Sequence, residues 1–321
     1  MNDTGYYWYK LSEANGFGPK SIYTVYKSII EKGCTIEDFF KLEKHEFEKR
    51  FPTLGKGRFK SANYESIKEL SDQVILKKFY ELQDKNIEII FPGHKEFPDR
   101  LVNHLERGIS SILFCLGKTD LLKKPSISIV GSRKASDDGL NAAHKLASKL
   151  SSAGKNIVSG YAKGIDTTAH MAALKNNGTT SMVLSYGILE FIHKNDFIGT
   201  SNMNNTLVIS QFHPKETWNA RNAMIRNKLV CALSEALIVI ESGEEKDDFG
   251  RMSGTFEAAK NALDMKIPLF VVSSTVFSES PPVGNIELIR RGGIEIYPDE
   301  IDSILNHINN TNSRVVKEWK F

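Results

Sequence analysis

Two stretches of the sequence decide the fold: SISIVGSRKAS, residues 126–136, and NIVSGYAKGIDTTAH, residues 156–170. In each, a short apolar run ends at a glycine-bearing turn that leads into a helical pattern. The same alternation continues downstream, so we predict an α/β fold with an extended, Rossmann-like, doubly wound and mostly parallel sheet covered by helices on both faces. The predicted strands are Ser126–Val130, Asn156–Ser159, Ser181–Ser185, Thr206–Ser210, Ala236–Ile240 and Pro268–Val272, and the predicted helices are Gly139–Ser152, Asp166–Asn176, Ala220–Ser234 and Thr255–Asp264.

The residues before this region divide into two parts. Apolar residues at helical spacing predict a small all-helical domain over residues 1–80, in which Pro19 suits the first turn of the second helix. The preceding Gly16-Phe17-Gly18 turn is similar to a helix-hairpin-helix unit that holds a phosphate, or is only a turn in a packing domain. Two apolar runs, Ile87–Phe91 and Ile112–Leu116, predict strands that lead into the sheet. We therefore predict a helical domain at 1–80, a Rossmann domain at 81–310 and a tail at 311–321.

Composition limits the class of protein. The 321 residues include 42 basic and 39 acidic side chains, a formal net charge of +3, which argues against a protein that coats polyanions everywhere but allows a local basic groove. The three cysteines, Cys34, Cys115 and Cys231, have no metal-ligand spacing, so we expect reduced thiols and no metal site. With no signal peptide and no apolar run long enough for a bilayer, we expect a soluble, cytoplasmic protein without a membrane partner.

The turn after the first strand of the sheet has the chemistry of an anion site. Parallel sheets bind ligands at the carboxyl ends of their strands. Gly131 permits a close backbone approach, Ser132 offers a hydroxyl, and Arg133 with Lys134 offers positive charge, although Arg133 could equally pack the turn. This turn is not GxGxxG, and no acidic residue ends the second strand, so an ordinary dinucleotide site and its cofactor are not expected.

The second strand leads into a loop bounded by Gly160 and Gly164. Lys163 between them is placed for an anion. Asp166 is predicted as the N-cap of the next helix, with His170 one turn further along the same face. The pair could do acid-base work, but we favour a structural cap with an oriented histidine and assign no catalytic residue.

Basic residues also gather after the fourth strand. Residues 211–230 carry four basic and one acidic side chain. Arg221, Asn222, Arg226, Asn227 and Lys228 lie near the start of a helix, where the amides and the helix dipole favour phosphate. The alternative is a solvated helix end.

An acidic segment follows the fifth strand. It is predicted to be a solvated loop, directed away from any DNA path, or a mobile flap, and its carboxylates lack metal-ligand spacing. The acidic residues are Glu244, Glu245, Asp247 and Asp248, and the anion-compatible turn that follows is Ser253, Gly254 and Thr255.

Together these motifs resemble the DNA-processing protein A family, DprA or Smf, over roughly residues 85–300. The quoted matches are Ile89–Gly93, Phe97–Leu101, Leu113–Gly117, Ile127–Arg133, Ser159–His170, Arg226–Lys228 and Leu288–Gly293. The resemblance implies a non-catalytic protein of natural transformation and DNA recombination. It would bind single-stranded DNA in a basic pocket, form a homodimer and pass the DNA to a RecA-like recombinase. It implies phosphate contacts from Arg133 and Lys163 in a pocket shaped by Gly131, Ser132, Gly160 and Gly164 and lined by Arg226 and Lys228.

The sequence departs from this family in three places. The acidic insert precedes Ser253, Lys228 replaces an arginine, and the C-terminal winged helix of many members is not expected, since only about 20 residues follow Ile301. A divergent member that works in phage defence is consistent with these departures.

An enzyme of another class is the alternative. Rossmann proteins of the LOG type cleave nucleoside monophosphates with a glutamate in GGxGTxxE. Here Ser253-Gly254-Thr255 is followed by Glu257, and Ala258 holds the expected glutamate position. One residue rotates a helical side chain by about 100°. Hydrolysis is therefore disfavoured, while a sensor that binds a nucleotide would use the same pocket.

Overall fold

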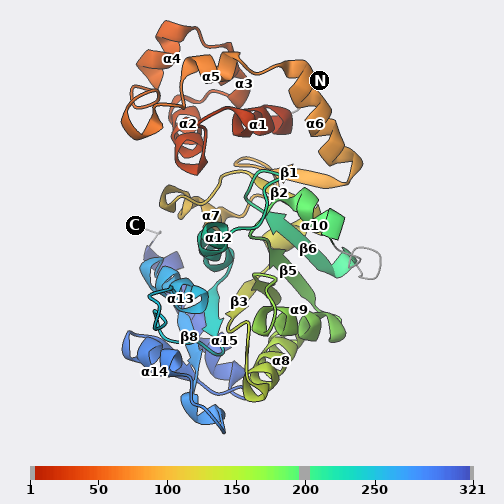
Figure 1. Ribbon diagram of the computed structural model, residues 1–321, viewed down its shortest axis with the longest axis vertical. Coiled ribbons are helices and arrows are strands. Elements are labelled where there is room, and N and C mark those ends of the chain that lie inside the picture. The colour runs from red at the N-terminus through yellow and green to blue at the C-terminus, as the bar shows by residue number, and fades with distance from the viewer. Residues whose placement is uncertain (1–3, 195–202, 319–321) are drawn as a thin grey trace. The chain divides into compact units, whose positions relative to one another are not determined.

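The computed structural model describes residues 4–194 and 203–318, and the chain divides into two compact units (Figure 1). Unit 1 comprises residues 1–119, 186–195 and 209–217, and unit 2 comprises residues 120–185, 196–208 and 218–321. The predicted boundaries near residues 80 and 310 stay predictions, and the last three residues of the predicted tail lie outside the described residues. No helix in the described ranges is long and apolar enough to cross a membrane.

Unit 1 combines short helices with an antiparallel strand pair. Gly16 has a φ of +79°, and a Cβ there would overlap the backbone of Ser61, so the turn before α2 requires glycine. Pro19 occupies the first turn of α2, as predicted. β1 pairs with β2 from Ile87 against Leu116. The helices and strands are α1 Thr4–Glu13, α2 Pro19–Lys32, α3 Ile36–Lys41, α4 Lys44–Arg50, η1 Gly57–Phe59, α5 Tyr64–Lys68, α6 Asp72–Asp84, β1 Ile87–Ile90, α7 Asp99–Val102, η2 Leu105–Arg107, β2 Leu113–Gly117 and α10 Ile188–Lys194.

Unit 2 contains the parallel sheet. Its strands follow the order β5-β4-β3-β7-β8-β9, and each neighbouring pair in that order is parallel. The doubly wound, mostly parallel sheet predicted from the sequence is confirmed. The elements, of which η3 begins and β6 ends with residues assigned to unit 1, are η3 Thr119–Leu122, β3 Ser126–Val130, α8 Asp137–Ser152, β4 Asn156–Ser159, α9 Ile165–Lys175, β5 Thr179–Val183, η4 Met203–Asn205, β6 Thr206–Ser210, α12 Ala220–Ala232, β7 Ala236–Val239, α13 Gly254–Asp264, β8 Leu269–Val272, η5 Ser274–Val276, α14 Val283–Arg290, β9 Ile294–Ile296 and α15 Ile301–Glu318.

The strands are buried on both faces, and β3 shows how. Ile127 and Ile129 join a core cluster with residues of α8, α9 and α15. Ser128, which points to the opposite face, donates a hydrogen bond to the Val230 carbonyl of α12 at 2.8 Å. Helices therefore cover both faces of the sheet, which is visible around β3 in Figure 1.

One strand lies two residues before its predicted position. The sequence predicts Ser181–Ser185, whereas β5 is Thr179–Val183. Thr179 pairs with Asn156 of β4, and the hydroxyl of Thr180 donates to the Ile157 carbonyl at 2.8 Å. The hydroxyl of Thr179 accepts a hydrogen bond from Nζ of Lys124 at 3.0 Å, so both buried hydroxyls have partners, and polar residues begin a strand that the apolar pattern placed later.

The strand order fixes where a ligand can bind. From β3 the chain continues outward through β4 and β5, and the later strands β7, β8 and β9 lie on the other side of β3. The order therefore reverses between β3 and β7. Open α/β sheets bind ligands outside the carboxyl ends of the strands at such a reversal.

Candidate functional site

A cavity of about 730 Å³ lies at this reversal, within unit 2. Its walls come from the turn after β3, the loop before α9, the first turns of α12, and the segment that joins β7 to α13. Of the residues singled out in the sequence, those that line it are Gly131, Ser132, Arg133, Asp166, Arg221, Arg226, Asn227, Ser253, Gly254 and Thr255. The fold thus brings residues from four separate segments to one cavity.

Arg226 is the buried cation of the cavity. The residue is 5% exposed, and its Nη1 lies 3.8 Å from Oδ2 of Asp166. A Cβ at position 160 would overlap the guanidinium group, so Gly160 makes room for it without lining the cavity. Among the described residues, Nε of Arg226 has no hydrogen-bond partner. A buried donor without a partner is costly, and a ligand oxygen would relieve that cost.

Asp166 is not the N-cap that the sequence predicts. α9 begins at Ile165 with Gly164 as its N-cap, and Asp166 lies in the first turn. Its Oδ2 accepts hydrogen bonds from the amides of Gly160 and Ala162 at 3.2 and 3.3 Å. Burial raises the pKa of this carboxyl, and the charge of Arg226 acts against that rise. Asp166 therefore holds the loop after β4 and the guanidinium of Arg226 in place.

His170 lies deeper in the fold, outside the cavity lining. The residue is 1% exposed, and its Nδ1 is 2.6 Å from the Thr180 hydroxyl. Burial, together with the charge of Arg226, lowers the pKa of His170 to about 3, so the ring is neutral. The hydrogen bond to Thr180 orients the ring in the core.

Besides Arg251, whose guanidinium pairs with Asp247, two exposed arginines line the cavity. Arg133 follows β3 and Arg221 begins α12, and no carboxylate of the described residues forms an ion pair with either. In the same turn, the Ser132 amide donates to the Glu241 carbonyl, and the Ser132 hydroxyl accepts from the Lys134 amide at 3.1 Å. The hydroxyl proton of Ser132 is thus available to an acceptor in the cavity.

The first turn of α8 already has an anionic partner. Ser136 caps this helix, and Oε2 of Glu241 accepts from the Ser136 amide at 2.9 Å and from its hydroxyl at 2.8 Å. Dinucleotide-binding Rossmann domains place a pyrophosphate at the helix after the first strand. Here a carboxylate of the chain lies there, and its charge disfavours a second anion.

The remaining predicted residues lie elsewhere. Lys134 and Lys163 are exposed but do not line the cavity. Asn222 is buried, and its amide donates to the N-cap Asn219. The same lining omits Gly164, whose Cβ position lies against the Ser132 carbonyl, and Lys228. Their roles in binding stay predictions.

Part of the cavity wall was not predicted from the sequence. Trp218 and Met224 line it from the α12 side, and Arg251 and Met252 line it from the segment after β7. The predicted solvated loop is therefore also a wall of the cavity. Trp218 comes directly before Asn219, the N-cap of α12. Its position at the start of a helix could have identified Trp218 as an exposed residue.

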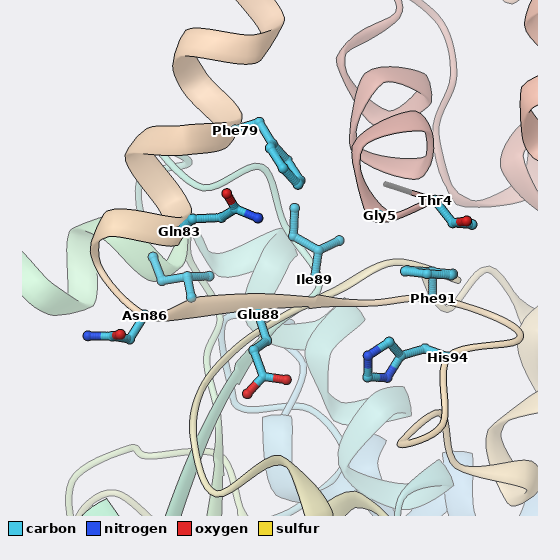
Figure 2. A pocket seen from close by; sticks show the side chains of 10 residues that line it. Thr4, Gly5, Phe79, Gln83, Asn86, Glu88, Ile89, Phe91 and His94 are labelled. Carbon is cyan, nitrogen blue, oxygen red and sulfur yellow. The ribbon is translucent and has the colours of Figure 1, made fainter. Parts of the chain in front are cut away.

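Other places in the molecule offer less to an anion. A cavity of about 680 Å³ in unit 1 has Phe79, Ile89 and Phe91 among its lining residues, and Glu88 and His94 are its ionisable ones (Figure 2). It lacks the arginines found in unit 2. Within the described ranges, no group of three His, Cys, Asp or Glu side chains could hold a metal ion.

Comparisons with known proteins agree on one family. The model of the DNA recombination-mediator protein A family matches residues 88–309. The DNA processing protein DprA of Streptococcus pneumoniae strain R6 is 40% identical over 136 residues, which cover 41% of this chain and 46% of that protein. DprA of Bacillus subtilis is 31% identical over 59% of this chain and 62% of its own. The chain thus spans about half to three fifths of these curated relatives.

Solved structures give the same result. DprA from Streptococcus pneumoniae superposes with a TM-score of 0.74 at 26% identity, over 92% of this chain and 95% of that one. DNA processing protein A from Helicobacter pylori, described for its single-stranded DNA binding mode, has a TM-score of 0.54 at 27% identity, over 68% and 94%. This chain belongs to the DNA recombination-mediator protein A family, whose curated members are called DprA or Smf.

Proposed function

We propose that the cavity of unit 2 binds single-stranded DNA by its sugar-phosphate backbone and does not react with it. The observation that carries the proposal is the state of Arg226. Its guanidinium is buried at the cavity, is 3.8 Å from one carboxylate, and keeps Nε without a partner among the described residues. Arg133 and Arg221 add exposed positive charge beside it. Guanidinium groups bind phosphate oxygens with paired hydrogen bonds.

The apolar part of the cavity suits a base. Trp218, which precedes α12, is 51% exposed, and Met224 of α12 also lines the cavity. Aromatic side chains next to a basic groove stack on unpaired bases with little regard to sequence. A single strand offers both a phosphate and an unstacked base at one site, whereas a duplex keeps its bases stacked.

Two features support a binding function over hydrolysis. Ala258 lines the cavity, while Glu257, the nearest carboxylate of α13, does not. Asp166 is held by two backbone amides and a guanidinium, and His170 is a neutral core residue. Neither side chain is placed as a general acid or base.

Family membership supports a proposal for the role of this binding in the cell. We propose that the chain processes DNA in natural transformation, that it passes the bound strand to a RecA-like recombinase, and that it acts as a homodimer. The relatives named above are DNA processing proteins.

Fluorescence anisotropy with labelled oligo-dT at several salt concentrations tests the proposal. The Arg133→Ala/Arg221→Ala variant should bind at least about tenfold more weakly, and its salt slope should fall by up to about 1.4, or about 0.7 for each phosphate that is no longer neutralised. The matched control is Lys123→Ala/Lys175→Ala, which removes two exposed charges at the opposite edge of the sheet, before β3 and at the end of α9. Equal binding by both double variants would contradict the proposal, as would release of free base from nucleoside monophosphates.

A further inference from the structure

The segment between β7 and α13 is an ordered hairpin, which we call the insert and define as residues 243–253. Lys246 and Met252 form an antiparallel bridge, and the Asp247 amide donates to the Arg251 carbonyl at 3.0 Å. The turn between them closes at Gly250, which has a φ of +73° and donates to the Asp247 carbonyl. The insert therefore has a defined tip.

Ion pairs fix the root of the insert to the helices of unit 2. Glu245 contacts Lys260 of α13 at 2.6 Å and Arg291, just after α14, at 3.0 Å. Its carbonyl accepts the Ser253 amide at 3.0 Å. One acidic residue of the insert is thus neutralised by two cations, and the tip projects from a fixed root.

The tip presents an aromatic ring to solvent. Phe249 is 82% exposed, and the guanidinium of Arg251 lies over its ring at 5.0 Å. The carboxylate of Asp247 accepts hydrogen bonds from the amides of Phe249 and Arg251 and from Nε of Arg251 at 2.7 Å. Arg251 also lines the cavity. Arg251 therefore both contacts the ring of Phe249 and lines the cavity.

We propose that Phe249 and Arg251 form a stacking platform for one unpaired base of a strand whose phosphate occupies the cavity. The platform rests on the proposed function and adds to it a base contact made by the insert. A large exposed ring gains from burial against another apolar surface, and a base offers a flat one. Arg251 holds one side of the ring and extends the platform towards the cavity.

The charges of the insert favour a base over a phosphate at the tip. Glu244 and Asp248 are exposed, one before Glu245 and the other after Asp247, the two acidic residues that have cationic partners. Glu244 and Asp248 would repel the backbone of a nucleic acid. A neutral base is not repelled. The strand would therefore keep its phosphates at Arg133, Arg221 and Arg226 and place only a base against Phe249, an arrangement that a duplex cannot adopt.

The test compares strands with and without bases. Affinities of the wild-type chain and of Phe249→Leu are measured for oligo-dA and for an abasic oligomer of the same length, with a matched duplex as a third probe. Leucine keeps an apolar side chain but removes the aromatic face. The ratio of dA to abasic affinity should fall about tenfold in Phe249→Leu, as expected when one base can no longer stack, with unchanged binding of the abasic strand and duplex. Phe249→Trp should retain or raise the ratio.

Met171→Ala is the matched control, because Met171 is another exposed apolar residue of unit 2, at 41% on α9, and should leave the ratio unchanged. A wild-type ratio retained by Phe249→Leu would overturn the platform while leaving the proposed function in place. An equal loss of affinity for both strands in Phe249→Leu would also overturn it. Failure of the wild-type chain to bind either strand would instead contradict the proposed function.

Discussion

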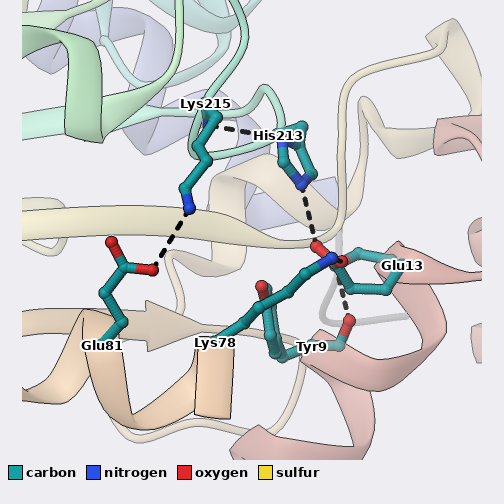
Figure 3. Close-up of polar contacts among 7 residues, drawn as sticks. Tyr9, Glu13, Lys78, Glu81, His213 and Lys215 are labelled. Atoms are coloured by element: carbon teal, nitrogen blue, oxygen red, sulfur yellow. Dashed lines mark hydrogen bonds and ion pairs between the residues drawn. The ribbon is translucent and has the colours of Figure 1, made fainter. Parts of the chain in front are cut away.

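Each unit buries a carboxylate beside basic side chains, and the two sites differ in the number and kind of basic partners that the carboxylate has. In unit 1, Glu13 contacts Lys78 and lies 3.0 Å from Nε2 of His213 (Figure 3). In unit 2, Asp166 faces Arg226 at 3.8 Å. Both carboxylates are almost fully buried, but Glu13 has two basic partners, Lys78 and His213, whereas the basic partner of Asp166, Arg226, also lines the cavity.

The pKa shifts of the two acids differ in sign. Burial alone would raise the pKa of Glu13, but the hydrogen bonds from His213 and Lys78 outweigh it and lower the pKa to about 2. Burial dominates for Asp166 and raises its pKa despite Arg226. In unit 1 the carboxylate of Glu13 is held by Lys78 and His213, which stabilises its ionised form. The site in unit 2 retains donor capacity, as expected where an anion is to bind.

The largest expected effect comes from removing Arg226. Arg226→Met would leave Asp166 buried without its cation, which should lower the free energy of unfolding by about 3–5 kcal/mol. Urea unfolding followed by circular dichroism measures the loss. The double variant Asp166→Asn/Arg226→Met removes both charges and should recover part of the stability but none of the affinity for DNA. A single variant as stable as the wild type would show that the pair is not buried as described.

A smaller effect, with a pH dependence, is expected at Glu13. Its pKa falls from 4.5 to about 2 on folding, so its stabilising contribution is present above the unfolded pKa and is lost as the pH falls towards 2. At pH 7 this contribution is on the order of a few kcal/mol, since a tenfold change in an acid dissociation constant corresponds to about 1.4 kcal/mol. Glu13→Gln should therefore be less stable than the wild type at pH 7, and the difference should disappear near pH 2.

The control for Glu13→Gln is a variant of the second ion pair drawn in Figure 3. Glu81 pairs with Lys215 at 3.3 Å, but both side chains are well exposed. Glu81→Gln should change the free energy of unfolding by less than about 1 kcal/mol, since exposed ion pairs contribute little. Equal urea midpoints for Glu13→Gln and Glu81→Gln at pH 7 would remove the distinction between a buried cluster and a surface pair.

The smallest effect is expected at Lys163. Because this side chain is exposed and outside the cavity lining, Lys163→Ala should weaken oligo-dT binding by about twofold through long-range charge alone. Arg133→Ala should weaken it several times more. Anisotropy titrations at one low salt concentration compare the affinities of the two variants for oligo-dT. A larger loss of affinity in Lys163→Ala than in Arg133→Ala would favour the phosphate contact that the family resemblance implies and would contradict the prediction made from the cavity lining.

Local pattern was sufficient to predict the sheet but not the whole site. The strands from Ser126, Asn156 and Thr206 begin and end as predicted, because their apolar runs are bounded by turns. The polar start of β5 was missed, because the partners of its hydroxyls, Nζ of Lys124 and the carbonyl of Ile157 in β4, are distant in sequence. Asp166 was misassigned for a similar reason, because its partners Gly160 and Ala162 precede the helix.

The cavity wall was the least predictable part of the site. Of the glycines and arginines predicted after strands, Gly131, Arg133, Arg221 and Arg226 line the cavity at the point where the strand order reverses, whereas Gly160 and Gly164 do not. Trp218 and Met252 reach the cavity only through the placement of α12 and of the insert. The acidic composition of the insert predicted repulsion from DNA. In the structure, Glu245 pairs with Lys260, and Asp247 pairs with Arg251, which itself lines the cavity.

Glu241 has a consequence for how this family member can be re-engineered. Its carboxylate fastens the chain just after β7 to the start of α8 through two hydrogen bonds to Ser136. The insert begins two residues later, so changes to its length or tip act downstream of a fixed anchor. Loops grafted between positions 243 and 253 would therefore all start from the same anchored position near the arginines of the cavity. The segment between β7 and α13 is thus a suitable place to vary ligand preference without changing the sheet.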